Sequence, residues 1–130
     1  MKHSVGFIGG GRITKILLQA FSNKNVKFNN IVVADTNIEV TSKLKNIYPF
    51  INVDIPSVAA SQDIVFISLH PPVIIDTLEL LKDHFRSSAT VISLAPKISI
   101  AGISSKLGQV KNIARLIPNA TSYINDGYNP

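Results

Sequence analysis

The sequence contains no cysteine, no tryptophan and a single methionine among its 130 residues. Without cysteine, disulfides, thiolate metal ligands and thiol nucleophiles are all excluded, and a reducing compartment is consistent with this composition. The three histidines, His3, His70 and His84, lie far apart and have no metal-ligand spacing. A Ser/His/Asp nucleophile arrangement and closely spaced paired carboxylates are also missing. We therefore predict no metal site and no hydrolytic centre.

Long apolar runs and a high charge content are missing as well. No stretch approaches the about 18 apolar residues needed to cross a bilayer, and no apolar segment of signal-peptide length precedes the first glycines, so we expect a cytoplasmic protein without a membrane partner. Charged residues make up 16% and hydrophobic residues 45%, which favours a globular domain with a buried core. The net charge of +5 comes from scattered lysines without interleaved aromatics, so we expect no nucleic-acid partner.

Short apolar runs alternate with segments of helical periodicity along the whole chain. Six runs are typical of strands: residues 5–8, 31–34, 50–53, 63–69, 90–94 and 112–117. Between them, helices are predicted from residue 13 to 21, from 38 to 47, near 56–61, from 71 to 85 and from 100 to 107. This alternation predicts one α/β domain over residues 1–130, with a Rossmann-type doubly wound parallel sheet in three layers and strand order 3-2-1-4-5-6.

The segment "VGFIGGGRIT", Val5 to Thr14, places three consecutive glycines between a predicted strand and a predicted helix. In a dinucleotide-binding fold this turn must be tight and must let the backbone approach a pyrophosphate at the helix N-terminus. Gly9 and Gly11 meet these two requirements. Thr14 stands at the position of the third fingerprint glycine, where its branched side chain is expected to push helix and strand slightly apart.

Asp35 ends the second predicted strand about 20 residues further on, where an acid binds the adenosine ribose hydroxyls. The alternative is a capping role for the helix that follows Thr36. A carboxylate at this position favours NAD, whereas a nearby arginine favours NADP. Arg12, at the start of the first helix, is the candidate arginine, so the sequence predicts NAD(P)H and leaves the choice between NAD and NADP open.

Two segments resemble the pyrroline-5-carboxylate reductases and the related deazaflavin-dependent NADP reductases. They are "GFIGGGRITKILLQAF" near the N-terminus and "ISLAPKISIAGISSKLGQVKNIARLIPNATSYINDG" further on, and the similarity covers essentially the whole chain. The resemblance implies the cofactor-binding Rossmann domain of an oxidoreductase that reduces a cyclic imine, a small-molecule substrate, in proline biosynthesis. It further implies a helical C-terminal domain, absent from this sequence, that builds a homo-oligomer and closes the substrate pocket.

The resemblance also assigns roles to individual residues. The implied cofactor-binding positions are Gly9, Gly11, Arg12 and Ile13 at the pyrophosphate, Asp35 and Thr36 at the adenosine ribose, Leu69, His70 and Pro71 in the loop after the fourth strand, and Ala95 and Asn119 near the nicotinamide.

His70 and Asn119 are the candidates for a catalytic role, because an imidazole titrates near neutrality and an amide can bind a carboxamide or carboxylate. The alternatives are a histidine that packs beside Pro71 and a turn asparagine after Pro118. For Arg115, inside the last predicted strand, a structural role is favoured.

The sequence departs from the family pattern at three places. His70 replaces a lysine, Pro96–Lys97 replaces Ala-Gly, and Ala120 replaces a threonine. Because Pro96 has no N–H, a hydrogen bond donated by the backbone there is lost. These departures leave the substrate open, and a non-catalytic dinucleotide-binding module or a reductase of another imine or carbonyl compound stays an alternative. We expect the isolated 130 residues to be a fragment or a bare domain with little turnover.

Overall fold

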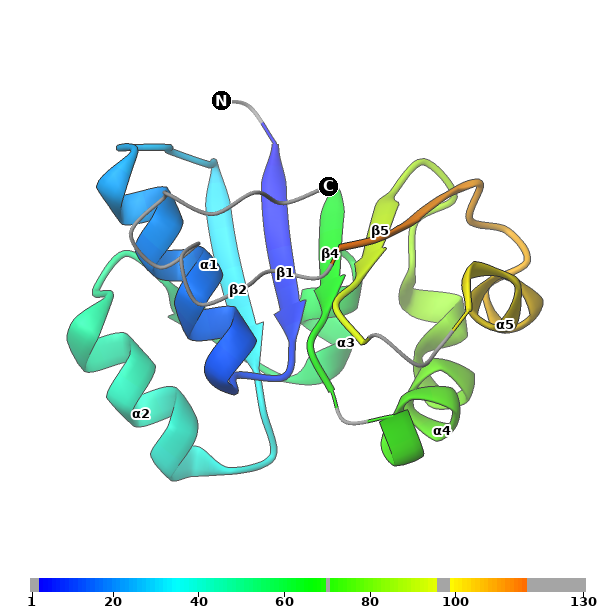
Figure 1. The fold of residues 1–130 in the computed structure, drawn as a ribbon, viewed down its shortest axis with the longest axis horizontal. Coiled ribbons are helices and arrows are strands. Elements are labelled where there is room, and N and C mark those ends of the chain that lie inside the picture. The colour runs from blue at the N-terminus through cyan, green and yellow to red at the C-terminus, as the bar shows by residue number, and fades with distance from the viewer. Residues whose placement is uncertain (1–2, 70, 96–98, 117–130) are drawn as a thin grey trace.

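The computed structural model describes residues 3–69, 71–95 and 99–116 as a parallel six-stranded sheet covered by helices (Figure 1). The strands are β1 (Ser4–Ile8), β2 (Asn30–Ala34), β3 (Asn52–Val53), β4 (Ile64–Ile67), β5 (Thr90–Ser93) and β6 (Asn112–Arg115). The helices are α1 (Arg12–Asn23), α2 (Ile38–Ile47), α3 (Pro56–Ala60), α4 (Pro71–Leu81) and α5 (Ile100–Lys106), with a 3₁₀ turn, η1, at Lys82–His84. The strand order β3-β2-β1-β4-β5-β6 confirms the predicted Rossmann-type doubly wound sheet.

Side chains that alternate along the strands divide the core into two clusters, one on each face of the sheet. Phe7 of β1 and Phe66 of β4 stack on one face, with ring centroids 4.9 Å apart, and the α1 and α2 side chains cover them. Ile8 and Ile67 point to the other face, under α3, α4 and α5. Because both faces are buried, the strands are almost continuously apolar, as expected for a parallel sheet.

Helix α3 lies so close to β1 that a side chain at Gly6 would not fit between them. A Cβ atom added to Gly6 of β1 would lie 1.9 Å from the backbone oxygen of Ala59 in α3. Ala59 and its neighbour Ala60 are fully buried. The absence of a side chain at Gly6 therefore sets the distance between α3 and the centre of the sheet.

The predicted elements differ from the observed ones mainly at their ends. The strand predicted over residues 63–69 is limited to Ile64–Ile67, and Phe85, predicted as the last core residue of a helix, lies after α4 and η1. Phe85 is nevertheless buried in the same cluster as Ile74 and Leu78 of α4. The 3₁₀ turn tightens the chain after Leu81, so the apolar stripe continues although the α-helix has ended.

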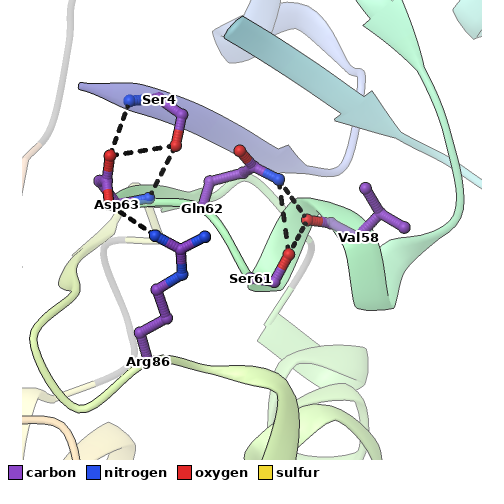
Figure 2. Close-up of polar contacts among 6 residues, drawn as sticks. All are labelled: Ser4, Val58, Ser61, Gln62, Asp63 and Arg86. Atoms are coloured by element: carbon purple, nitrogen blue, oxygen red, sulfur yellow. Dashed lines mark hydrogen bonds and ion pairs between the residues drawn. The ribbon is translucent and has the colours of Figure 1, made fainter. Parts of the chain in front are cut away.

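At the N-terminal ends of β1 and β4, Ser4, Asp63 and Arg86 form a polar clip (Figure 2). Asp63 Oδ2 accepts hydrogen bonds from the backbone N–H of Ser4 at 3.0 Å and from Ser4 Oγ at 3.2 Å. Asp63 Oδ1 accepts from Arg86 Nη1 at 2.9 Å. The hydrogen bond from the Ser4 backbone, then its hydroxyl and the Arg86 charge, lower the pKa of Asp63 below its usual value.

The lowered pKa of Asp63 predicts a stability contribution that disappears in acid. A carboxylate with a depressed native pKa stabilises the fold above its unfolded-state pKa of about 3.9 and loses this contribution as the pH falls through the native pKa. We expect Asp63→Asn to lower the Tm by about 3 °C at pH 7 and by less at pH 3. The loss at pH 7 is modest because the ion pair with Arg86 is partly exposed. Thermal denaturation at both pH values tests this, with Asp76→Asn, at an exposed position of α4, as the control. An equal loss at both pH values would contradict it.

Candidate cofactor-binding site

Gly9 makes the sharp turn between β1 and α1, and its backbone requires glycine. Its φ is +104°, and an added Cβ would lie 2.2 Å from the backbone oxygen of Ser68, which follows β4. Its N–H donates to the carbonyl of Ala34 at the end of β2, at 2.7 Å. The turn is therefore held between the carboxyl ends of the two strands that flank β1 in the sheet.

Asp35 joins this turn to the chain that follows β2. Its Oδ2 accepts a hydrogen bond from the N–H of Gly10, and its Oδ1 accepts from the N–H of Asn37, both at 2.8 Å. Asn37 in turn caps α2, because its side-chain oxygen accepts from the N–H of Glu39 at 3.0 Å. The capping role considered for Asp35 thus belongs to Asn37, and Asp35 fixes the positions of the glycine turn and of the α2 start.

The N-terminus of α1 is open where the turn ends. Gly11 is the N-cap residue, no side chain of the described residues caps the helix, and its first turn holds no acidic residue. Gly11 is exposed, and a Cβ added to it would meet no atom of the described part of the chain within 4 Å. Arg12, the first helical residue, is exposed beside it, whereas Ile13 packs against the core below. Uncapped N–H groups next to open space are the arrangement in which a helix N-terminus binds an anion.

Thr14 takes part in the turn and does not act only as a spacer between helix and strand. Its side chain is fully buried, and its Oγ1 donates a hydrogen bond to the carbonyl of Gly9 at 2.7 Å. The expectation that it merely pushes α1 away from the sheet missed this bond. The hydroxyl satisfies a buried carbonyl in the turn, which glycine at the same position cannot do.

A hollow of about 240 Å³ lies at the carboxyl edge of the sheet, next to the turn. Four predicted cofactor-binding residues line it: Gly9, Asp35, Thr36 and Leu69. The remaining lining residues come from the sheet and from α3 and α4: Ile8, Ala34, Pro56, Thr77, Leu80 and Leu81. The walls are mainly apolar, and the carboxylate of Asp35 stands at one side. This combination suits a flat, weakly polar ring attached to a hydroxylated sugar.

The sequence did not single out the contributions of α3 and α4 to this hollow. Pro56 was placed on a short helix and Leu80 on a longer one, but neither belongs to a motif. The topology offers a signal, because a chain that leaves β3 or β4 must pass the carboxyl edge before the next helix. Another hollow, of about 340 Å³ and lined by Phe21, Phe28 and Phe50 among others, lies at the opposite edge, so size alone does not locate the site.

The other predicted site residues divide into two groups. Pro71 begins α4, as predicted, and Ala95 is buried just after β5, where its N–H donates to Ser93 Oγ at 3.3 Å. Ala95 is not among the described residues that line the 240 Å³ hollow. His70 and Asn119, like Pro96, Lys97 and Ala120, lie outside the described residues. The structure therefore brings together the predicted residues of the turn and of the adenosine end, and leaves the nicotinamide end as an expectation.

The described part of the chain holds no cluster of metal ligands and no helix suited to crossing a membrane. Among residues 3–69, 71–95 and 99–116, no three His, Cys, Asp or Glu side chains gather as a metal ion would require. None of the helices in these ranges has the length and apolar character needed to traverse a bilayer.

Residues 4–97 match the model of a protein family described as NADP oxidoreductase, coenzyme F420-dependent. The chain belongs to this family. The matched region runs from β1 into the segment after β5, so it contains the glycine turn, Asp35 and the 240 Å³ hollow. The Rossmann-type domain of this chain is thus that of an oxidoreductase family.

Several proteins to which this chain is similar are pyrroline-5-carboxylate reductases. The protein of Corynebacterium melassecola is 27% identical over 128 residues, which cover 95% of this chain and 47% of that protein. The structure of the reductase from Coxiella burnetii is 25% identical with a TM-score of 0.86, covering 99% of this chain and 48% of the other. The structure of the Plasmodium falciparum pyrroline carboxylate reductase with NADP bound has a TM-score of 0.80 at 19% identity and covers 98% and 46%. The chain spans about half the length of these relatives.

Proposed function

We propose that residues 1–130 form the NAD(P)H-binding domain of a reductase. The observation that carries this proposal is the open N-terminus of α1 at Gly11, next to a turn that Asp35 fixes. Space for a Cβ at Gly11 means that the protein itself does not require glycine there. A pyrophosphate that approaches the backbone does require it, since a side chain would occupy its place.

Each part of the cofactor has residues that fit it. Gly9, Gly11 and Arg12 fit the pyrophosphate, with Ile13 anchoring the helix start in the core. Asp35 and Thr36 fit the adenosine ribose, and the hollow behind Leu69 fits the adenine. By family resemblance, His70 and Pro71 are assigned to the loop that covers the cofactor after β4, and Ala95 and Asn119 to the nicotinamide end.

The reaction that we propose is the reduction of a C=N bond in a cyclic imine. The reduced nicotinamide supplies a hydride to an electrophilic carbon, so the protein contributes mainly position and electrostatics. The names of the relatives support pyrroline-5-carboxylate as the substrate and proline biosynthesis as the setting. His70 and Asn119 are the candidates for contact with the substrate, His70 for proton transfer and Asn119 for binding a carboxylate.

The proposal extends to the setting in which the domain works. We place the enzyme in the cytoplasm, with a small-molecule substrate, no nucleic-acid or membrane partner, and a homo-oligomeric full-length form. The relatives are about twice as long as this chain, which supports a second region that completes the substrate pocket. The 130 residues alone are therefore expected to bind the cofactor and to turn over little substrate.

Titration of the purified 130-residue chain with NADH and with NADPH, followed by calorimetry, tests the cofactor assignment. We expect saturable one-to-one binding of at least one of the two, because the glycine turn, Asp35 and ten residues that line the hollow all belong to this chain. The reaction is tested separately by following NAD(P)H oxidation when a full-length protein with this domain receives pyrroline-5-carboxylate. Saturable binding without any reduction of this imine would refute the substrate and leave the cofactor site in place.

A further inference from the structure

The carboxylate of Asp35 is held at the position where the two dinucleotides differ. Both of its oxygens accept backbone hydrogen bonds, from Gly10 N–H and from Asn37 N–H at 2.8 Å each, as an ionised carboxylate does. It also lines the 240 Å³ hollow assigned to the adenosine. Two bonds from opposite sides leave this side chain little freedom to turn away from a ligand in that hollow.

The segment around Asp35 contains acids and no cation. From Phe28 to Ser42 the sequence holds Asp35 and Glu39 but no lysine or arginine. Glu39 lies in the first turn of α2, directly after the strand end. Asp35 is the acid that lines the 240 Å³ hollow, and the surrounding segment adds no cation to offset its charge.

A second, shallow hollow of about 440 Å³ lies on the other side of Asp35, between α2 and β3. Lys45 is the one cation among the described residues that line it. Its Nζ is already engaged, since it donates to the carbonyl of Pro49 at 2.9 Å and to that of Ile51. This lysine would have to give up two carbonyl partners before it could pair with a phosphate.

We infer that Asp35 makes this chain selective for NAD(H) over NADP(H), which sets it apart from the NADP description of its family. The inference rests on the proposed cofactor site. A ribose with a free 2′-hydroxyl donates a hydrogen bond to the carboxylate, whereas a 2′-phosphate places like charge against it, and no free cation lies among the described residues that line the two hollows beside Asp35. Arg12 begins α1 and is not among the residues that line either hollow beside Asp35, so we assign it to the pyrophosphate that both cofactors share.

The test compares the dissociation constants of NADH and NADPH for the same protein by calorimetry. For the wild type we expect NADH to bind at least about tenfold more tightly, a difference of about 1.4 kcal/mol. Asp35→Asn removes the charge and should bring the ratio close to one. Asp35→Ser combined with Thr36→Arg, at an exposed position, adds a cation and should invert the ratio. Asp54→Asn, the same change at the end of neighbouring β3, is the matched control and should leave the ratio unchanged.

The outcomes separate this inference from the proposed function on which it rests. Because the ratio is measured within one protein, a general loss of stability in a variant affects both constants alike. Equal or tighter binding of NADPH by the wild type would refute the NAD(H) preference alone. Binding of neither cofactor would refute the cofactor site and the preference together. A larger loss of NADPH than of NADH affinity in Arg12→Ala would also overturn the inference, because it would place Arg12 at the 2′-phosphate.

Discussion

Gly6→Ala is expected to destabilise the domain by about 3 kcal/mol or more, enough to leave much of the chain unfolded at 37 °C. The added Cβ would lie 1.9 Å from the backbone oxygen of Ala59 and 3.1 Å from its Cα. Neither partner is a flexible side-chain end, so α3 as a whole would have to move away from the sheet. Such a movement opens the cluster around Ala59 and Ala60, both fully buried.

Urea denaturation followed by circular dichroism measures this loss. Gly108→Ala is the matched control, because a Cβ there meets no atom within 4 Å and its backbone is not in the left-handed region. We expect the control to change the free energy of unfolding by less than about 0.5 kcal/mol. A Gly6→Ala protein as stable as the control would show that α3 is not held against β1 in the way described.

Gly11→Asp is expected to abolish cofactor binding while leaving the fold as stable as before or slightly more stable. Aspartate is a favoured N-cap residue, and a negative charge at a helix N-terminus is stabilising. The same charge would stand where the pyrophosphate must approach the α1 amides, so the affinity should fall at least about a hundredfold, which corresponds to about 2.8 kcal/mol. Opposite effects on stability and binding distinguish a ligand site from a structural turn.

Two measurements on the same preparations test this prediction: the free energy of unfolding, and the affinity for whichever dinucleotide the wild type binds. Gly11→Ala gives an intermediate case, because it adds bulk to the turn without charge. If Gly11→Asp kept the wild-type affinity, the glycine turn would not be a pyrophosphate site. If Gly11→Asp unfolded the protein, the inference that the fold tolerates a side chain at this position would be wrong.

The fold was predictable because its signals are local and repeated. Pro71 begins α4 as a proline in the first helical turn should, and the continuous apolar run of β4 marks the strand that pairs with both β1 and β5. The alternation of elements implies right-handed crossovers in a parallel sheet, and the glycine turn after the first strand favours the strand order of dinucleotide-binding folds. Strand ends, such as that of β4, were less accurate: the strand ends at Ile67, but Ser68 still donates its N–H to the carbonyl of Ile8 at 2.9 Å and the apolar Leu69 follows, so the sequence gives no sharp boundary.

The site was predictable where backbone conformation demands a residue type. Gly9 follows from the sharp turn and Asp35 from its place at the end of β2. The bond from Gly10 to Asp35 and the bond from Thr14 to Gly9 join side chains to backbone groups across the turn. Neither bond has a periodic signature, and the same is true of the walls that Pro56 and Leu80 add to the hollow from separate helices.

The bond between Gly10 and Asp35 has a consequence for the thermodynamics of binding. It connects the segment that we assign to the phosphates with the acid that we assign to the sugar, and because it joins two groups of the protein it needs no ligand to form. A dinucleotide that occupies both places therefore meets one preorganised unit, and little conformational entropy remains to be lost in the protein. The backbone of residues 9–11 and 35–37 is accordingly expected to be the same in the free and the bound chain.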